Sequence, residues 1–84
     1  MIIVRLPAML RRPEMLNDIK IETPVSTIDE LVTELNARYP GLALQLDDSI
    51  FNFAINDAIV LHGVRQHALR PGDAVEVIPT ISGG

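Results

Sequence analysis

The last two residues, Gly83 and Gly84, end the chain in backbone without side chains, so the only chemical group there is the terminal carboxylate. A residue without Cβ lets the backbone enter a narrow channel that any side chain would block. The carboxylate is therefore a candidate reactive group that the chain presents inside a partner's active site. Terminal glycines are also common as floppy ends or expression scars, so the preceding residues must decide.

Other residues make weak candidates for a catalytic or metal site. The chain has no Cys, which excludes disulfides and thiolate metal ligands. His62 and His67 are five residues apart in a predicted loop, unlike the tight pairs of zinc motifs. The neighbouring carboxylates of Asp47 and Asp48 are typical of solvated loop charge. Gly72 lacks the following helix that a phosphate-binding loop needs. We predict no metal site and no bound cofactor, so any ATP chemistry belongs to a partner.

Composition predicts one small folded domain with a protein as its partner. Of the 84 residues 48% are hydrophobic and only 21% are charged, which supplies enough core material for independent folding. The net charge of −4 argues against nucleic acid as the main partner and favours a protein with a basic face. No signal peptide and no apolar run of about 20 residues is present, so we expect a cytoplasmic protein without membrane insertion.

Two strands and then a helix are predicted in the first half of the chain. The β-branched run from Ile2 to Leu6 ends at Pro7, and alternation at Ile19 and Ile21 indicates a second strand that forms a hairpin with the first. Thr27 and Glu30 offer a capping box for a helix that Pro40 and Gly41 end. Apolar residues at helical spacing form its buried stripe: Ile28, Leu31, Val32, Leu35 and Tyr39.

The second half predicts three further strands. Leu42–Leu46 form a link that is either a short helical turn or irregular extended chain. A strand from Phe51 to Ile55 turns at Asn56 and Asp57 into a strand from Ile59 to Leu61. The last strand includes Val75 and Val77 and ends at Pro79. This order predicts an α+β fold with one helix across a mixed sheet, whose core includes Val4, Leu6, Phe53, Val75 and Val77.

The chain divides into a domain of residues 1–79 and a flexible tail of residues 80–84. Pro79 has no N–H and a fixed φ, so we expect strand pairing to end there and the exit to be stiff. The segment from Pro79 to Gly84 reaches about 20 Å when extended. Ile78 and Arg5 fall on the sheet face opposite the helix, where an exposed apolar patch would mark a partner site. Ile78 is equally well explained as a single exposed residue.

Order and spacing of several residues resemble the ubiquitin-like β-grasp sulfur carriers of the ThiS and MoaD type. The matching residues are Ile55, Asn56, Leu69, Pro71, Gly72, Asp73, Val75 and the ending Pro79, Thr80, Ile81, Ser82, Gly83, Gly84. The resemblance implies a β-grasp fold with a mixed four- to five-stranded sheet packed on one main helix and a flexible C-terminal Gly-Gly tail. Length and ending look more like the molybdopterin synthase small subunit than the thiamin carriers. The segment Leu6–Arg11 resembles actinobacterial carriers that serve a cysteine synthase.

Two positions depart from the family pattern. Asp57 stands where a glycine commonly follows the asparagine of the hairpin, which alters the turn. Thr80 stands where many molybdopterin members have a second proline, which we expect to soften the exit of the tail.

The resemblance implies a sulfur carrier that is not itself an enzyme. An E1-like adenylyltransferase would join Gly84 to AMP with ATP and Mg²⁺, and sulfur would displace AMP to leave a thiocarboxylate. A molybdopterin synthase large subunit, or a cysteine or thiazole synthase, would receive the sulfur. Gly83 would enter both active sites with Gly84, and the partner-binding residues would be Pro79, Thr80, Ile81, Ser82, Ile78 and Arg5. Two alternatives are a ubiquitin-like protein modifier, joined through Gly84 to a lysine, and a plain binding module.

Overall fold

The computed structural model describes residues 1–15, 18–46 and 50–80. The strands of this part are β1 (Ile2–Arg5), β2 (Ile19–Ile21), β3 (Phe51–Ile55), β4 (Ala58–Val60) and β5 (Ala74–Pro79). The helices are a 3₁₀ turn η1 (Ala8–Leu10), α1 (Ile28–Arg38) and the short α2 (Leu42–Gln45). The predicted order of two strands, a helix and three strands is confirmed.

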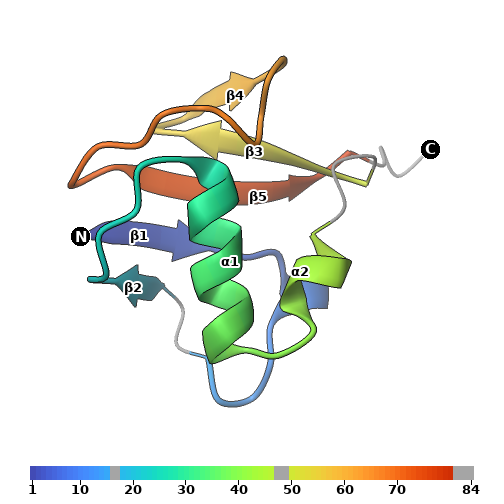
Figure 1. Ribbon diagram of the computed structural model, residues 1–84. Helices are drawn as coiled ribbons and strands as arrows, with labels where there is room; N and C mark the ends of the chain where they lie inside the picture. The colour runs from blue at the N-terminus through green and yellow to red at the C-terminus, as the bar shows by residue number, and fades with distance from the viewer. Residues whose placement is uncertain (16–17, 47–49, 81–84) are drawn as a thin grey trace.

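The five strands form one mixed sheet in the order β2-β1-β5-β3-β4. β1 and β5 pair in parallel at its centre, and the other neighbouring pairs are antiparallel. Figure 1 shows α1 crossing one face of this sheet, with α2 near one end of the molecule. The sheet arrangement therefore brings the chain's first strand beside its last and places the last strand at the centre.

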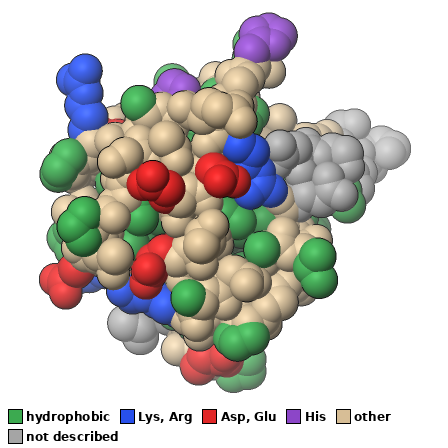
Figure 2. Space-filling model, viewed as in Figure 1, with side chains coloured by type: hydrophobic (Ala, Val, Ile, Leu, Met, Phe, Trp, Pro, Cys, Tyr) green, Lys and Arg blue, Asp and Glu red, His purple; other side chains and the backbone are tan. Residues whose placement is uncertain are grey.

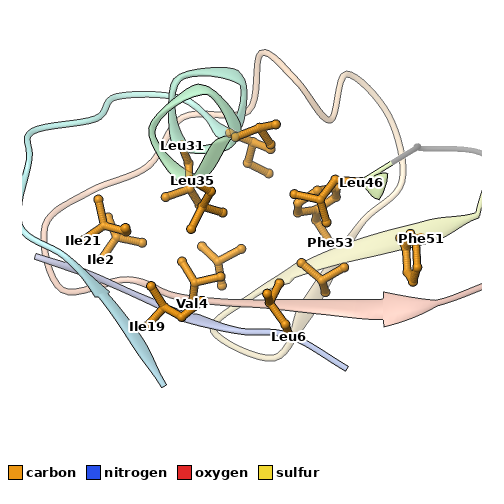
Figure 3. Packing of buried hydrophobic residues seen from close by; sticks show 14 of the residues in the cluster. Ile2, Val4, Leu6, Ile19, Ile21, Leu31, Leu35, Leu46, Phe51 and Phe53 are labelled. Carbon is orange, nitrogen blue, oxygen red and sulfur yellow. The ribbon is translucent and has the colours of Figure 1, made fainter. Parts of the chain in front are cut away.

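The core lies between α1 and the sheet. Figure 3 shows side chains from β1, β2 and β3 pointing toward Leu31 and Leu35 of the helix. The predicted core residues are confirmed, since each is buried to 3% exposure or less: Val4, Leu6, Phe53, Val75 and Val77. Burial alternates along β1, β2 and β5, as the two-residue period of a strand requires. In β3 the small side chain of Ala54, on the opposite sheet face, is buried as well.

A capping box holds the start of α1, as predicted. The Thr27 hydroxyl accepts the Glu30 N–H at 3.2 Å. The Glu30 carboxylate accepts the N–H of Ser26 at 2.7 Å, one residue earlier than the usual partner. Gly41, with φ of 91°, turns the chain after the helix in a conformation that favours glycine.

Three local predictions are corrected or completed by the structure. Of the two alternatives for the link after α1, the helical one holds, and Leu42 and Leu46 are fully buried. The 3₁₀ turn η1 was not predicted. β4 begins one residue earlier than expected, at Ala58, because Ile55 pairs with Ala58 across a turn of only two residues.

Candidate functional site

The candidate site is the point where β5 ends and the C-terminal tail begins. Pro79 is the last residue of β5, and Thr80 is the last described residue. The four remaining predicted site residues lie outside the described residues: Ile81, Ser82, Gly83 and Gly84. The described part of the site is therefore the surface of the domain at the end of β5.

Thr80 is held to the start of β3 by two hydrogen bonds. Its N–H and its hydroxyl both donate to the carbonyl oxygen of Ile50, each at 2.8 Å. The prediction that the last strand ends at Pro79 is confirmed. One backbone hydrogen bond, from Thr80 to the residue before β3, continues the contact past the strand end. The expectation that Thr80 softens the exit is corrected, since this residue is anchored to its own domain.

Pro79 fits in the central strand β5 because its nitrogen, which has no hydrogen to donate, points to the side where no neighbouring strand needs a donor. Backbone groups of successive strand residues point to opposite neighbours. The Thr80 N–H is directed at β3, so the Pro79 nitrogen is directed away from β3, toward β1. Pairing of β1 with β5 reaches only Arg5 and Glu76, so no ladder bond is lost at Pro79.

A shallow groove of about 360 Å³ opens beside this exit, where the chain leaves β1 and enters η1. Its lining combines apolar side chains with charges of both signs: Arg5, Leu6, Pro7, Ala8, Arg11, Glu76, Val77, Ile78 and Pro79. The structure thus brings three of the predicted partner-binding residues together: Arg5, Ile78 and Pro79. Sequence reasoning did not assign Arg11 to this surface. The one feature of the sequence that pointed to Arg11 was its position in the segment Leu6–Arg11, which resembles the actinobacterial carriers.

The charge on Arg5 is stabilised by a neighbour. Its Nε donates to the Asp18 carboxylate at 3.2 Å, and this hydrogen bond and the negative charge raise the pKa of Arg5 above its ordinary value. Both side chains are exposed, so the pair contributes little to folding. The guanidinium, which is charged with or without Asp18, lies at the groove. Arg11 Nε donates to the Leu6 carbonyl oxygen at 3.2 Å, which orients a second guanidinium there.

The other residues considered as chemical groups do not gather at this exit. His62 and His67 are exposed in the loop after β4, and Figure 2 shows histidine side chains projecting at the surface. Within residues 1–15, 18–46 and 50–80, no three His, Asp or Glu side chains are placed to share a metal ion. Asp47 and Asp48 lie outside the described residues. No helix in the same ranges has the length and apolar character required to span a bilayer.

Comparison with solved structures identifies the fold. A chain in the crystal structure of the Amycolatopsis orientalis BexX/CysO complex superposes with a TM-score of 0.85 at 21% identity, covering 100% of both chains. The crystal structure of Mycobacterium tuberculosis CysO, described as an antigen, gives a TM-score of 0.81 at 25% identity over 95% of this chain and 99% of that one. The chain shares the fold of these structures, a β-grasp fold, as the sequence resemblance implied.

Sequence comparison identifies the family. The Homo sapiens molybdopterin synthase sulfur carrier subunit is 42% identical over 55 residues, which are 66% of this chain. The match spans 60% of the length of that human relative. A model of the ThiS family matches residues 4–84, which includes the groove and the whole tail. The chain therefore belongs to the ThiS family of sulfur carriers.

Proposed function

We propose that this protein carries sulfur as a thiocarboxylate on Gly84, most directly for molybdopterin synthesis. The observation that carries the proposal is the family match, which runs through the domain and ends at Gly84. The domain supports it physically, because the central strand β5 ends at Pro79, only a few residues before Gly83 and Gly84 in the sequence. Backbone without side chains suits entry into a narrow catalytic channel.

The chemistry follows from the poor reactivity of a carboxylate. An E1-like adenylyltransferase joins the Gly84 carboxylate to AMP from ATP and releases pyrophosphate, with Mg²⁺ balancing the phosphate charge. Hydrosulfide then attacks the acyl carbon, AMP leaves with the bonding electrons, and the loss of one proton yields the thiocarboxylate. The thiocarboxylate sulfur bonds to the recipient to give a thioester, and hydrolysis of this thioester by water leaves the sulfur on the recipient and regenerates the Gly84 carboxylate. Catalysis thus belongs to the partner enzymes, and this chain supplies the acyl group.

The groove beside the exit is the surface we assign to partner docking. It adjoins the last residues of β5 on the β1 side and is lined by apolar side chains and by Arg5 and Arg11. A partner that takes up the tail comes close to this surface, because residues 81–84 reach only about 13–14 Å when extended. Ile78 and Pro79 then contact apolar groups of the partner, and the arginines pair with its carboxylates.

Molybdopterin synthase and a cysteine synthase are the two recipients that the comparisons favour. The human relative is named as a molybdopterin synthase sulfur carrier subunit, which supports a molybdopterin synthase large subunit as the partner. Similarity to the CysO structures, together with the Leu6–Arg11 segment, supports a cysteine synthase instead. Purified recipients of both classes, offered the thiocarboxylate form, will distinguish these pathways by which one regenerates the carboxylate.

Mass spectrometry tests the proposed reaction. Incubation with the cognate adenylyltransferase, ATP, Mg²⁺ and sulfide should make the protein about 16 Da heavier, because sulfur replaces one oxygen at Gly84. A variant with one alanine appended after Gly84 keeps the domain but moves the carboxylate off the glycine, and it should remain unconverted. If the native protein stays unchanged while a known carrier is converted by its own enzyme, the proposal fails.

The same appended variant separates the other functions. A plain binding module retains its function with the extra residue, whereas a carrier loses it. A protein modifier produces higher-mass conjugates in lysate that disappear when Gly84 is deleted.

A further inference from the structure

We infer that Thr80 is a positioning residue that fixes where the reactive tail leaves the domain. The inference rests on the proposed function, since it concerns how the Gly84 carboxylate is delivered. We call the pair of hydrogen bonds from Thr80 to the Ile50 carbonyl oxygen the exit clamp. Both bonds are 2.8 Å long, the N–H supplying one and the hydroxyl the other.

The exit clamp uses a side chain that the neighbouring residue could not replace. Pro79 has no N–H, so it cannot donate to either neighbouring strand. Thr80 donates twice to one carbonyl oxygen, which has two lone pairs and can accept both bonds. The threonine hydroxyl thus adds a second anchor at the last residue before the four that follow, residues 81–84.

The clamped carbonyl belongs to a well-fixed part of the molecule. Ile50 precedes β3, which is paired along its length with β5 from Phe51 opposite Pro79 to Ile55 opposite Val75. The side chain of Phe51 is buried to 4% exposure, so the start of β3 is held by the core as well as by the ladder. Thr80 is therefore attached to the most extensively paired strands of the sheet.

The clamp sets both the reach and the direction of the tail. With Thr80 held, the distance from this anchor to the Gly84 carboxylate is at most the length of four extended residues, about 13–14 Å. Without the clamp the departure point moves back to Pro79 and the tail has one more residue to order on binding. Ordering a residue has an entropic cost, so a partner binds the clamped carrier more tightly than the unclamped one.

Thr80→Val removes the hydroxyl and keeps the size and branching of the side chain. We expect KM for the carrier in the adenylyltransferase reaction to rise about three- to tenfold, the range that one hydrogen bond supplies, with kcat unchanged. Thr80→Ser restores the hydroxyl and should return KM to the native value. Hydrogen exchange of the Thr80 amide in the isolated protein should be slow in the native chain and faster in Thr80→Val.

Thr33→Val is the matched control. The Thr33 hydroxyl also donates to a backbone carbonyl, that of Asp29 at 3.1 Å, and the bond is likewise exposed. This residue is on α1, so Thr33→Val should leave KM unchanged while it reproduces any general effect of the substitution on the unfolding temperature.

Three results would overturn the inference. One is native KM in Thr80→Val, and another is unprotected exchange of the Thr80 amide in the native chain. The third is a raised KM with exchange unaltered by the substitution, which assigns the hydroxyl to a contact with the partner. Failure of the native chain to be adenylated at all would instead remove the proposed function. The exchange measurement then still decides whether the clamp exists.

Discussion

Asp57 is a residue whose backbone is strained and whose replacement should stabilise the fold. Asn56 and Asp57 form the turn between β3 and β4 with φ of 50° and 73°. This region costs non-glycine residues about 1–2 kcal/mol, less for Asn and Asp, and glycine almost nothing. We expect Asp57→Gly to increase the free energy of unfolding by about 0.5–1 kcal/mol and the unfolding temperature by a few degrees. Calorimetry measures both.

Asn56→Gly is the control for that prediction, because it relieves the same backbone conformation at the preceding residue. Asn56 differs in what its side chain does. Its carbonyl oxygen accepts the Ala74 N–H at 2.9 Å, and its amide donates to the Asp73 carboxylate at 3.0 Å. Asn56→Gly should therefore destabilise the protein. A stabilised Asn56→Gly, or a destabilised Asp57→Gly, would contradict this account of the turn.

Asp73 makes part of the stability depend on pH. Hydrogen bonds from the Arg70 N–H at 2.9 Å and from the Asn56 amide lower the pKa of the Asp73 carboxyl below its ordinary 3.8. A carboxyl with a lowered pKa in the folded state stabilises the fold fully above the ordinary value. This stabilisation is lost as pH falls through the folded-state pKa. The effect is small, because the carboxylate is largely solvated.

Urea unfolding across pH measures this contribution. Native protein should be more stable than Asp73→Asn at pH 7, and the difference should shrink as the pH falls below about 4. Asp57→Asn removes a negative charge from the neighbouring turn without touching these hydrogen bonds, so it controls for net charge. A difference between native protein and Asp73→Asn that stays constant from pH 7 to pH 2.5 would exclude the proposed role of Asp73.

Elements that carry a local signal in the sequence, such as a capping box or a regular spacing of apolar residues, could be predicted. Thr27 and Glu30 mark the start of α1, and the apolar stripe that follows them is buried as expected except at its last residue. Tyr39 is the C-cap of the helix and is half-buried. Alternation at Val75 and Val77 places β5 correctly, with Ile78 half-buried on the other face. These predictions succeed because capping and burial depend on neighbours within a few residues.

The parts that sequence reasoning missed depend on contacts between distant residues. η1 and α2 are too short to show periodicity. The Arg12 guanidinium donates a hydrogen bond to the side-chain oxygen of Gln45 at 3.1 Å and so links the segment after η1 to α2. The exit clamp joins Thr80 to Ile50, thirty residues earlier, and it arises from strand register. Pro79 correctly indicated where the last strand ends. Which residue is then anchored depends on the register of β5 against β3, and this could not be predicted from the sequence.

In the whole molecule, the groove and the exit clamp lie on opposite sides of the same strand end. β5 is central in the sheet, so its last residues have β3 on one side and the space left by β1 on the other. The β3 side anchors Thr80, and the β1 side opens into the groove that Ile78 and Pro79 line. A partner seated in the groove is therefore positioned by the same strand that orients the tail. The end of β5 therefore takes part both in docking the partner and in directing the tail toward it.

Ile78→Glu tests whether the groove is the docking surface. A charge at this half-buried position disturbs an apolar contact with the partner, and buried charges without partners are costly. We expect KM for the carrier with the adenylyltransferase to rise at least about tenfold, equivalent to about 1.4 kcal/mol. Leu61→Glu introduces the same charge at a 76% exposed residue next to the edge strand β4, and it should leave KM unchanged.

The unfolding temperatures of both variants complete this test, because Ile78→Glu must remain folded for its KM to be informative. Should its domain be destabilised, Ile78→Ala removes most of the apolar side chain without a charge and should give a smaller rise in KM. Equal KM values for native protein, Ile78→Glu and Leu61→Glu would place docking elsewhere on the molecule. Equal losses in both glutamate variants would indicate an effect of net charge that does not depend on position, since this chain of −4 becomes more negative in each. Only a loss confined to position 78 supports the groove, because the two substitutions are matched in charge and differ in their place on the sheet.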